Sequence, residues 1–176
     1  MKATKKLLRT AYHEAGHAYA DYSYGIAIKL VTITPDGDSL GHIKRKNKLS
    51  GLIEQAGLSK RQVQEFYEYC VTLFAGQASE KFFCGNSSTY GASGDRRKAV
   101  DIVMHLFGTK EAMNAALRLF YIQAKYLVIT PRAKLLIPRL AKTLVKKKTL
   151  TGDEVKALFR EVMKAKFSKR DSMPAV

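Results

Sequence analysis

The stretch AYHEAGHAYA, residues 11–20, holds two of the chain's four histidines, and they are four positions apart. Residues four apart lie above one another on one face of a helix, so His13 and His17 can both reach a single metal ion. Glu14 can stand beside an open coordination position and take a proton from an activated water. The spacing predicts a zinc site of the peptidase type. The alternative is a pair of histidines on a polar helix face.

A catalytic zinc ion needs a third protein ligand and keeps one position open. The longer pattern H-E-x-x-H-x-x-G-x-x-H is absent, because position 23 is Ser23. Spacing alone does not choose the third ligand from the other histidines and nearby carboxylates. These candidates are His42, His105, Asp21, Glu80, Asp95 and Asp101.

The elements that must position these residues indicate an α+β fold that is mainly α-helical. Apolar residues three and four apart predict a helix over 4–24. Alternating β-branched residues then predict a strand over 26–35 and an antiparallel partner over 39–45. A small antiparallel sheet should therefore lie beside the helix that carries the two histidines.

The rest of the chain predicts further helices. One should run from Ser59, its N-cap, to about residue 84, followed by a loop over 85–94. The next should start near Ser93 or Gly94 and end at Gly108. Three more helices begin at capping residues, namely Thr109, Thr130 and Thr151. We expect one domain over 1–168, with a metal-site half over 1–108, a helical part over 109–168 and a frayed tail over 169–176.

Composition and charge restrict the class of protein. The two cysteines, Cys70 and Cys84, form no disulfide framework, and no apolar run is long enough for a membrane span, so we expect a cytoplasmic protein. The net charge is +16, and residues 109–176 supply 16 Lys or Arg against 5 Asp or Glu. Such an excess could attract nucleic acid or another acidic partner. The simpler explanation is a solvated basic surface.

Several stretches, read in order, carry a family resemblance. They are AYHEAGHAYA, VTITPDGDSLGHI, VTLFAGQASEKFFCG, STYGASGDRRKAVDIV and LAKTLVKKKTLTGDEVKALF. Their order and spacing resemble the peptidase domain of the FtsH family of ATP-dependent zinc proteases, over nearly the whole chain.

The resemblance implies roles for individual residues. It implies that His13 and His17 bind one zinc ion, that Glu14 is the catalytic base and that Asp95, in GASGD, is the third ligand. An aspartate in the first turn of a helix is also favoured by the helix dipole, which is the alternative explanation of Asp95. Glu80 would support a histidine from behind or be the third ligand itself, and the alternative explanation is an ordinary surface glutamate. The strand containing Leu40, Gly41, His42 and Ile43 would border the cleft and bind a polypeptide substrate along its edge.

The sequence also departs from the family pattern. No Walker A pattern occurs in these 176 residues, so the expected activity is ATP-independent in itself, with a separate ATPase as a potential partner. Gln77, Tyr90 and Gly94 replace residues common in the family, which weakens any inference about its ring of six. The sequence does not decide whether the protein forms a homo-oligomer. The expected function is a zinc endopeptidase, and the alternative is a peptidase-like module that binds nucleic acid through basic C-terminal helices.

Overall fold

The computed structural model describes residues 4–36, 40–45, 59–87 and 89–171, with only the backbone described for 89–92 and 166–171. Within these ranges the chain forms α1 (Lys5–Ser23), β1 (Ile28–Thr32), β2 (His42–Arg45), α2 (Lys60–Cys84), α3 (Thr89–Leu106), α4 (Lys110–Ile129), α5 (Pro131–Lys147), β3 (Thr149–Thr151) and α6 (Gly152–Asp171). The expected mainly helical α+β fold with a small antiparallel sheet is confirmed.

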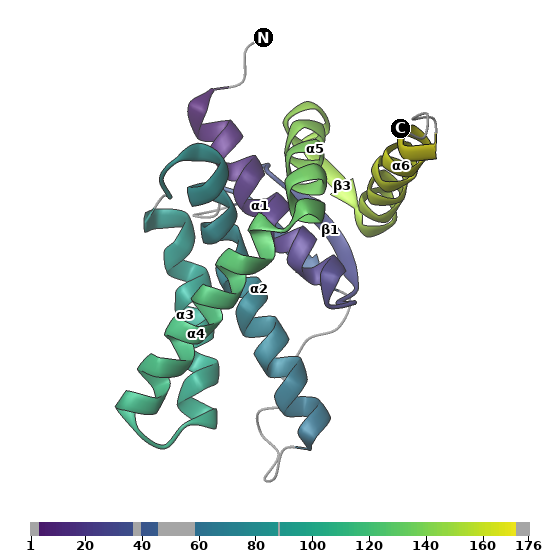
Figure 1. The fold of residues 1–176 in the computed structure, drawn as a ribbon. Helices are drawn as coiled ribbons and strands as arrows, with labels where there is room; N and C mark the ends of the chain where they lie inside the picture. The colour runs from purple at the N-terminus through teal and green to yellow at the C-terminus, as the bar shows by residue number, and fades with distance from the viewer. Residues whose placement is uncertain (1–3, 37–39, 46–58, 88, 172–176) are drawn as a thin grey trace.

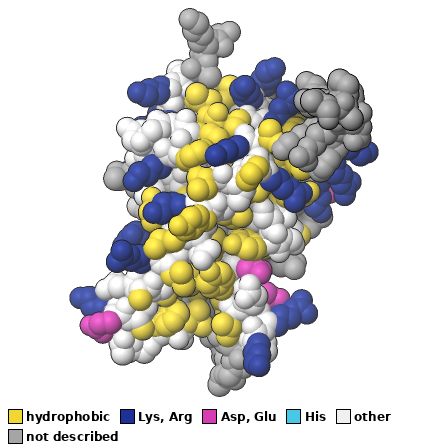
Figure 2. All heavy atoms as spheres, in the orientation of Figure 1, with side chains coloured by type: hydrophobic (Ala, Val, Ile, Leu, Met, Phe, Trp, Pro, Cys, Tyr) yellow, Lys and Arg dark blue, Asp and Glu magenta, His cyan; other side chains and the backbone are white. Residues whose placement is uncertain are grey.

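Helix α1 lies at the centre of the molecule. It packs against α2 and α5, while α4 packs against α2 and the sheet lies alongside α1 (Figure 1). None of the helices in the described ranges has the length and apolarity needed to cross a membrane. On the face shown in Figure 2, hydrophobic side chains form a central band, and Lys and Arg side chains are scattered around it.

The helix ends follow local sequence signals. Ser59 caps α2 by accepting a hydrogen bond from the Gln62 backbone N–H, and the Gln62 side chain accepts one from the Ser59 backbone N–H, which completes a capping box. Gly85 ends the helix with φ of 83°, a conformation that glycine adopts without strain. Thr130 caps α5, and Pro131 occupies its first position.

Several expected boundaries differ from the structure. Helix α3 begins at Thr89, several residues before the predicted start at Ser93 or Gly94, so part of the predicted loop is helical. Strands β1 and β2 are shorter than the ranges expected for them. Helix α6 continues to Asp171, and residues 172–176 of the expected tail lie outside the described residues.

The sheet has the order β2-β1-β3, with both pairs antiparallel. Val31 in the central strand is opposite Ile43 on one side and Leu150 on the other. The third strand was not predicted. Strand β2 lies at the edge of this sheet, so among the described strands only β1 pairs with it.

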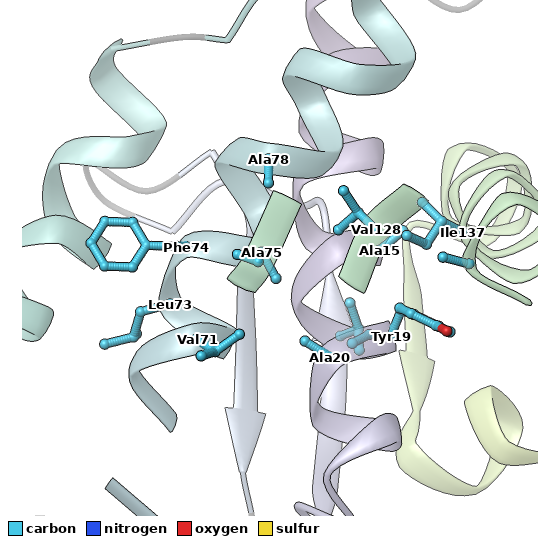
Figure 3. Packing of buried hydrophobic residues seen from close by; sticks show 14 of the residues in the cluster. Ala15, Tyr19, Ala20, Val71, Leu73, Phe74, Ala75, Ala78, Val128 and Ile137 are labelled. Carbon is cyan, nitrogen blue, oxygen red and sulfur yellow. The ribbon is translucent and has the colours of Figure 1, made fainter. Parts of the chain in front are cut away.

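The core is built on close contact between α1 and α2. Small residues lie at this contact: Gly16 on α1 lies against Ala75 and Ser79 on α2, and Ala75 and Ala78 are buried (Figure 3 shows part of the buried cluster). A Cβ atom on Gly16 would lie 2.5 Å from the backbone oxygen of Ala75. The two helices can therefore approach closely only because these side chains are small, and this approach positions the α1 histidines against α2.

Candidate metal centre

The two histidines project from successive turns of α1 into the interior. His13 is 6% exposed and His17 is 3% exposed, so the alternative of a polar surface pair is wrong. Their Nε2 atoms lie 3.1 Å apart, and the rings meet edge to face with centroids 4.7 Å apart. Four-residue spacing on one helix face thus brings two ring nitrogens to one point, as the sequence predicts.

Asp95 reaches the same point from α3. Its Oδ2 atom lies 3.2 Å from Nε2 of His13 and 3.0 Å from Nε2 of His17. Donor atoms bound to one tetrahedral zinc ion at 2.0–2.2 Å lie about 3.3–3.6 Å apart, so these three atoms need to separate by only a few tenths of an ångström to hold such an ion. Burial alone would raise the pKa of Asp95, but the two imidazoles hold it well below its usual range.

The dipole explanation of Asp95 is wrong. Because α3 begins at Thr89, Asp95 lies in the second turn of the helix, and the first turn contains no acidic residue. Its carboxylate faces the histidines, with Lys98 Nζ 3.8 Å from the other oxygen. The remaining candidates do not join the triangle: His105 is exposed and its Nδ1 bonds to the Asp101 carbonyl oxygen on its own helix.

The ring of His17 is held in a defined tautomer. Its Nδ1–H donates to the backbone oxygen of Thr72 on α2 at 2.6 Å. In the neutral ring this leaves the lone pair on Nε2, which is the atom that faces Asp95. A backbone or carboxylate acceptor behind a histidine is typical of metal-binding imidazoles.

Glu80 lies behind His13. It is 2% exposed and is therefore not a surface residue. Its Oε2 atom is 3.5 Å from His13 Nδ1, and its Oε1 atom accepts a hydrogen bond from Arg9 Nε at 2.7 Å. Burial alone would lower the pKa of His13, but contacts with Asp95 and Glu80 outweigh it and raise the pKa to about 10. Glu80 thus approaches the ring nitrogen that does not face Asp95.

Glu14 lies beside the triangle on the same turn of α1. It is 5% exposed, and burial raises its pKa above the ordinary glutamate value. Gly41 passes next to it, since a Cβ atom on Gly41 would lie 3.0 Å from Glu14 Cγ and 2.8 Å from the Thr32 backbone oxygen. The segment before β2 can therefore run close to Glu14 only without a side chain at position 41.

These groups open into a cleft of about 910 Å³. The metal-site residues and Glu14 line it, and so do all four residues expected at its border: Leu40, Gly41, His42 and Ile43. The strand itself begins at His42, so Leu40 and Gly41 precede it. The structure thus brings the expected border segment and the histidine pair to one cavity.

Gly76 on α2 is a site residue that the sequence did not single out. A Cβ atom there would collide with His17 Nε2 and would lie 2.7 Å from His17 Cε1 and 2.8 Å from His13 Nε2. Only glycine leaves room for both rings at this crossing of α1 and α2.

Gly76→Ala is therefore expected to weaken metal binding at least about tenfold, an effect comparable with loss of a group behind a ligand. Alanine favours the helix, so circular dichroism should show an intact fold. Metal content after dialysis measures the effect. Gly94→Ala is the matched control, because nothing lies within 4 Å of a Cβ atom at position 94. Equal metal content in both variants would contradict this account of Gly76.

A buried ion pair fixes β2 against α1, one turn beyond His17. Arg45 Nε donates to Asp21 Oδ2 at 2.9 Å, and Arg45 also lies over the Tyr69 ring. Asp21 is fully buried, and its burial raises its pKa while Arg45 opposes that rise. Asp21, one of the candidate ligands, is thus paired with Arg45.

Arg45→Met is expected to lower the free energy of unfolding by about 3–5 kcal/mol, because it leaves the Asp21 carboxylate buried without its cation. Adding Asp21→Asn should restore much of the loss. Urea denaturation measures both, and Lys44→Met, an exposed change on the same strand, is the control. If the double variant is no more stable than Arg45→Met, the pair does not explain the loss.

Part of this chain resembles known proteins. Residues 1–115 match the model of the family described as Peptidase family M41. The chain is 36% identical over 99 residues to "ATP-dependent zinc metalloprotease FtsH" of Chlamydia trachomatis serovar L2, covering 53% of this chain and 10% of that protein. It is 35% identical over 105 residues to "ATP-dependent zinc metalloprotease YME1L" of Drosophila melanogaster, covering 55% of this chain and 13% of that protein.

The chain spans only about a tenth of the length of these relatives. The family match, however, covers well over half of the chain and includes the helices that carry the two histidines, Glu14 and Asp95. The expected FtsH-type resemblance is confirmed, and the chain belongs to peptidase family M41.

Proposed function

We propose that this chain is a zinc-dependent endopeptidase that cuts flexible or unfolded polypeptides. The observation that carries the proposal is the convergence of His13, His17 and Asp95 within hydrogen-bond distance of one another, with Glu14 beside them in an open cleft. One zinc ion held there would act as a Lewis acid on the scissile carbonyl and on the attacking water.

The chain's own residues would hold the ion and move the protons of the reaction. The His17 tautomer, set by Thr72, keeps Nε2 free to bind the ion, and the proton that His13 holds in the metal-free site must leave when the ion binds. Glu14 would take the proton of the attacking water and pass it to the leaving amine, and its burial suits a base with a raised pKa.

Substrate binding would use the edge of the sheet. Among the described strands only β1 pairs with β2, so an extended peptide could add along the other side of β2, next to Glu14. Backbone pairing of this kind selects extended chains with little sequence preference. Hydrolysis at this site consumes no nucleotide, and folded substrates would need a separate ATPase to unfold them.

The direct test is cleavage of denatured casein by the purified protein. Zinc-loaded protein should cut, a chelator should stop cleavage, and added zinc should restore it. The cleavage rate of the Glu14→Gln variant measures the background from contaminating proteases. If wild type cuts several unfolded substrates no faster than Glu14→Gln, the proposal is wrong.

The second candidate, nucleic-acid binding through the basic C-terminal helices, has weaker support. Several of those charges are already paired, as Lys147 is with Glu154 and Arg139 with Glu161. The positive side chains visible in Figure 2 are scattered rather than gathered into a stripe. Binding driven by phosphate contacts would weaken steeply with salt, so an anisotropy titration with labelled DNA at low and high salt distinguishes the two functions.

A further inference from the structure

The cleft around the metal centre carries charges of both signs, and its negative charges are balanced more fully than its positive ones. Three acidic residues line it: Glu14 and Asp95 face the ion site, and Glu80 pairs with Arg9. A divalent ion would balance the first two. Arg45, also in the lining, is paired with Asp21.

The remaining cations of the cleft lining have no ion-pair partner among the described residues, apart from the contact of Lys98 with Asp95. They are Lys5, Lys6, Arg97 and Lys98, all exposed. Within the described ranges Lys5, Lys6 and Arg97 form no ion pair, and Lys98 approaches only Asp95, at 3.8 Å. We call these four residues the basic rim.

The position of the rim along the cleft is set by α1. Lys6 lies seven residues before His13, which places both on one face of the helix. Seven residues of helix rise about 10 Å, and about three residues of an extended peptide cover the same length. Arg97 and Lys98 follow Asp95 on α3, so the rim draws on two helices that also carry metal-site residues.

We propose that the basic rim makes this site selective for acidic polypeptides, with Asp or Glu about three residues from the scissile bond. The inference rests on the proposed peptidase function and adds a substrate class to it. Backbone pairing with β2 would align the chain, and the rim would favour acidic side chains at that distance. Exposed charge pairs are each worth a few-fold in binding, so two or three of them together should change kcat/KM roughly threefold to thirtyfold.

The test uses fluorogenic peptides that share one cleavable centre and one composition. One places two glutamates about three residues from the centre, a second places them at least eight residues away, and a third replaces them by glutamines. Wild type should cut the first fastest, and the preference should weaken as salt rises. Lys6→Glu/Arg97→Glu should abolish or invert it.

The matched control is Lys142→Glu/Lys146→Glu, which changes the net charge equally on exposed positions of α5, outside the cleft. This variant should keep the wild-type preference. If both double variants lower the preference equally, or if wild type cuts the first two peptides at the same rate, the rim is not selective.

Binding separates this inference from the proposed function. Anisotropy of the labelled peptides on zinc-loaded Glu14→Gln measures the rim without hydrolysis. If none of the three peptides is cut but the first peptide still binds tightest, the peptidase proposal fails and the rim stands as a binding surface. If the peptides are cut but all three bind equally, the rim inference fails alone.

Discussion

Glu14→Gln is expected to lower kcat/KM on an unfolded substrate about 10²–10⁴-fold, the usual contribution of a general base. The amide keeps the size and burial of the side chain but cannot accept the proton of the attacking water. Glu14 supplies none of the three atoms that converge on the ion site, so the zinc content of the variant should equal that of the wild type. Cleavage rate and metal content of the same sample measure the two effects.

Asp101→Asn is the matched control, since it removes an exposed carboxylate of α3 that does not line the cleft. This variant should keep wild-type activity. A Glu14→Gln protein that retains zinc and more than a tenth of the activity would show that another group accepts the proton. One that loses both zinc and activity would instead assign Glu14 to metal binding.

Asp95→Ala is expected to lower zinc affinity by more than about 100-fold, beyond the range seen when a group behind a ligand is lost. The substitution removes one of the three atoms that converge on the site, and it leaves two neutral imidazoles to hold the ion. The variant should fold, because Asp95 lies in an exposed stretch of α3. Metal analysis after dialysis against a weak chelator measures the loss.

Glu80→Ala is the informative comparison. It removes the carboxylate behind His13 and should cost about 10–100-fold in affinity, less than Asp95→Ala. The reverse order, with zinc kept in Asp95→Ala and lost in Glu80→Ala, would make Glu80 the third ligand and contradict the assignment of Asp95.

The predictable parts of the fold are those that depend on residues close together in the sequence. The N-caps Ser59 and Thr130 gave correct starts for α2 and α5, because capping acts within one turn. The start of α3 was missed because Gly91 and Gly94 resemble loop residues, yet the helix contains both. Strand β3 was missed because three residues cannot show an alternating pattern.

The candidate site likewise has residues that local spacing predicts and residues that it does not. The histidine pair follows from four-residue spacing, and Asp95 could be chosen only through the family resemblance, since it is 78 residues from His17 along the chain. The Thr72 carbonyl behind His17 and the space left by Gly76 were out of reach, because both depend on how closely α1 and α2 approach. Contacts between distant elements leave no signal in local periodicity.

Strand β3 joins the C-terminal part of the chain to the N-terminal part by pairing with β1. The family match stops at residue 115, but β3 hydrogen-bonds to β1, and the Ile33 backbone N–H donates to the Lys148 carbonyl oxygen at 2.9 Å. A protein shortened to residues 1–115 would lack the strand that pairs with one side of β1, and it would expose the side of α1 that packs against α5. Such bare backbone is a template for self-association, so light scattering should reveal aggregates of the shortened protein.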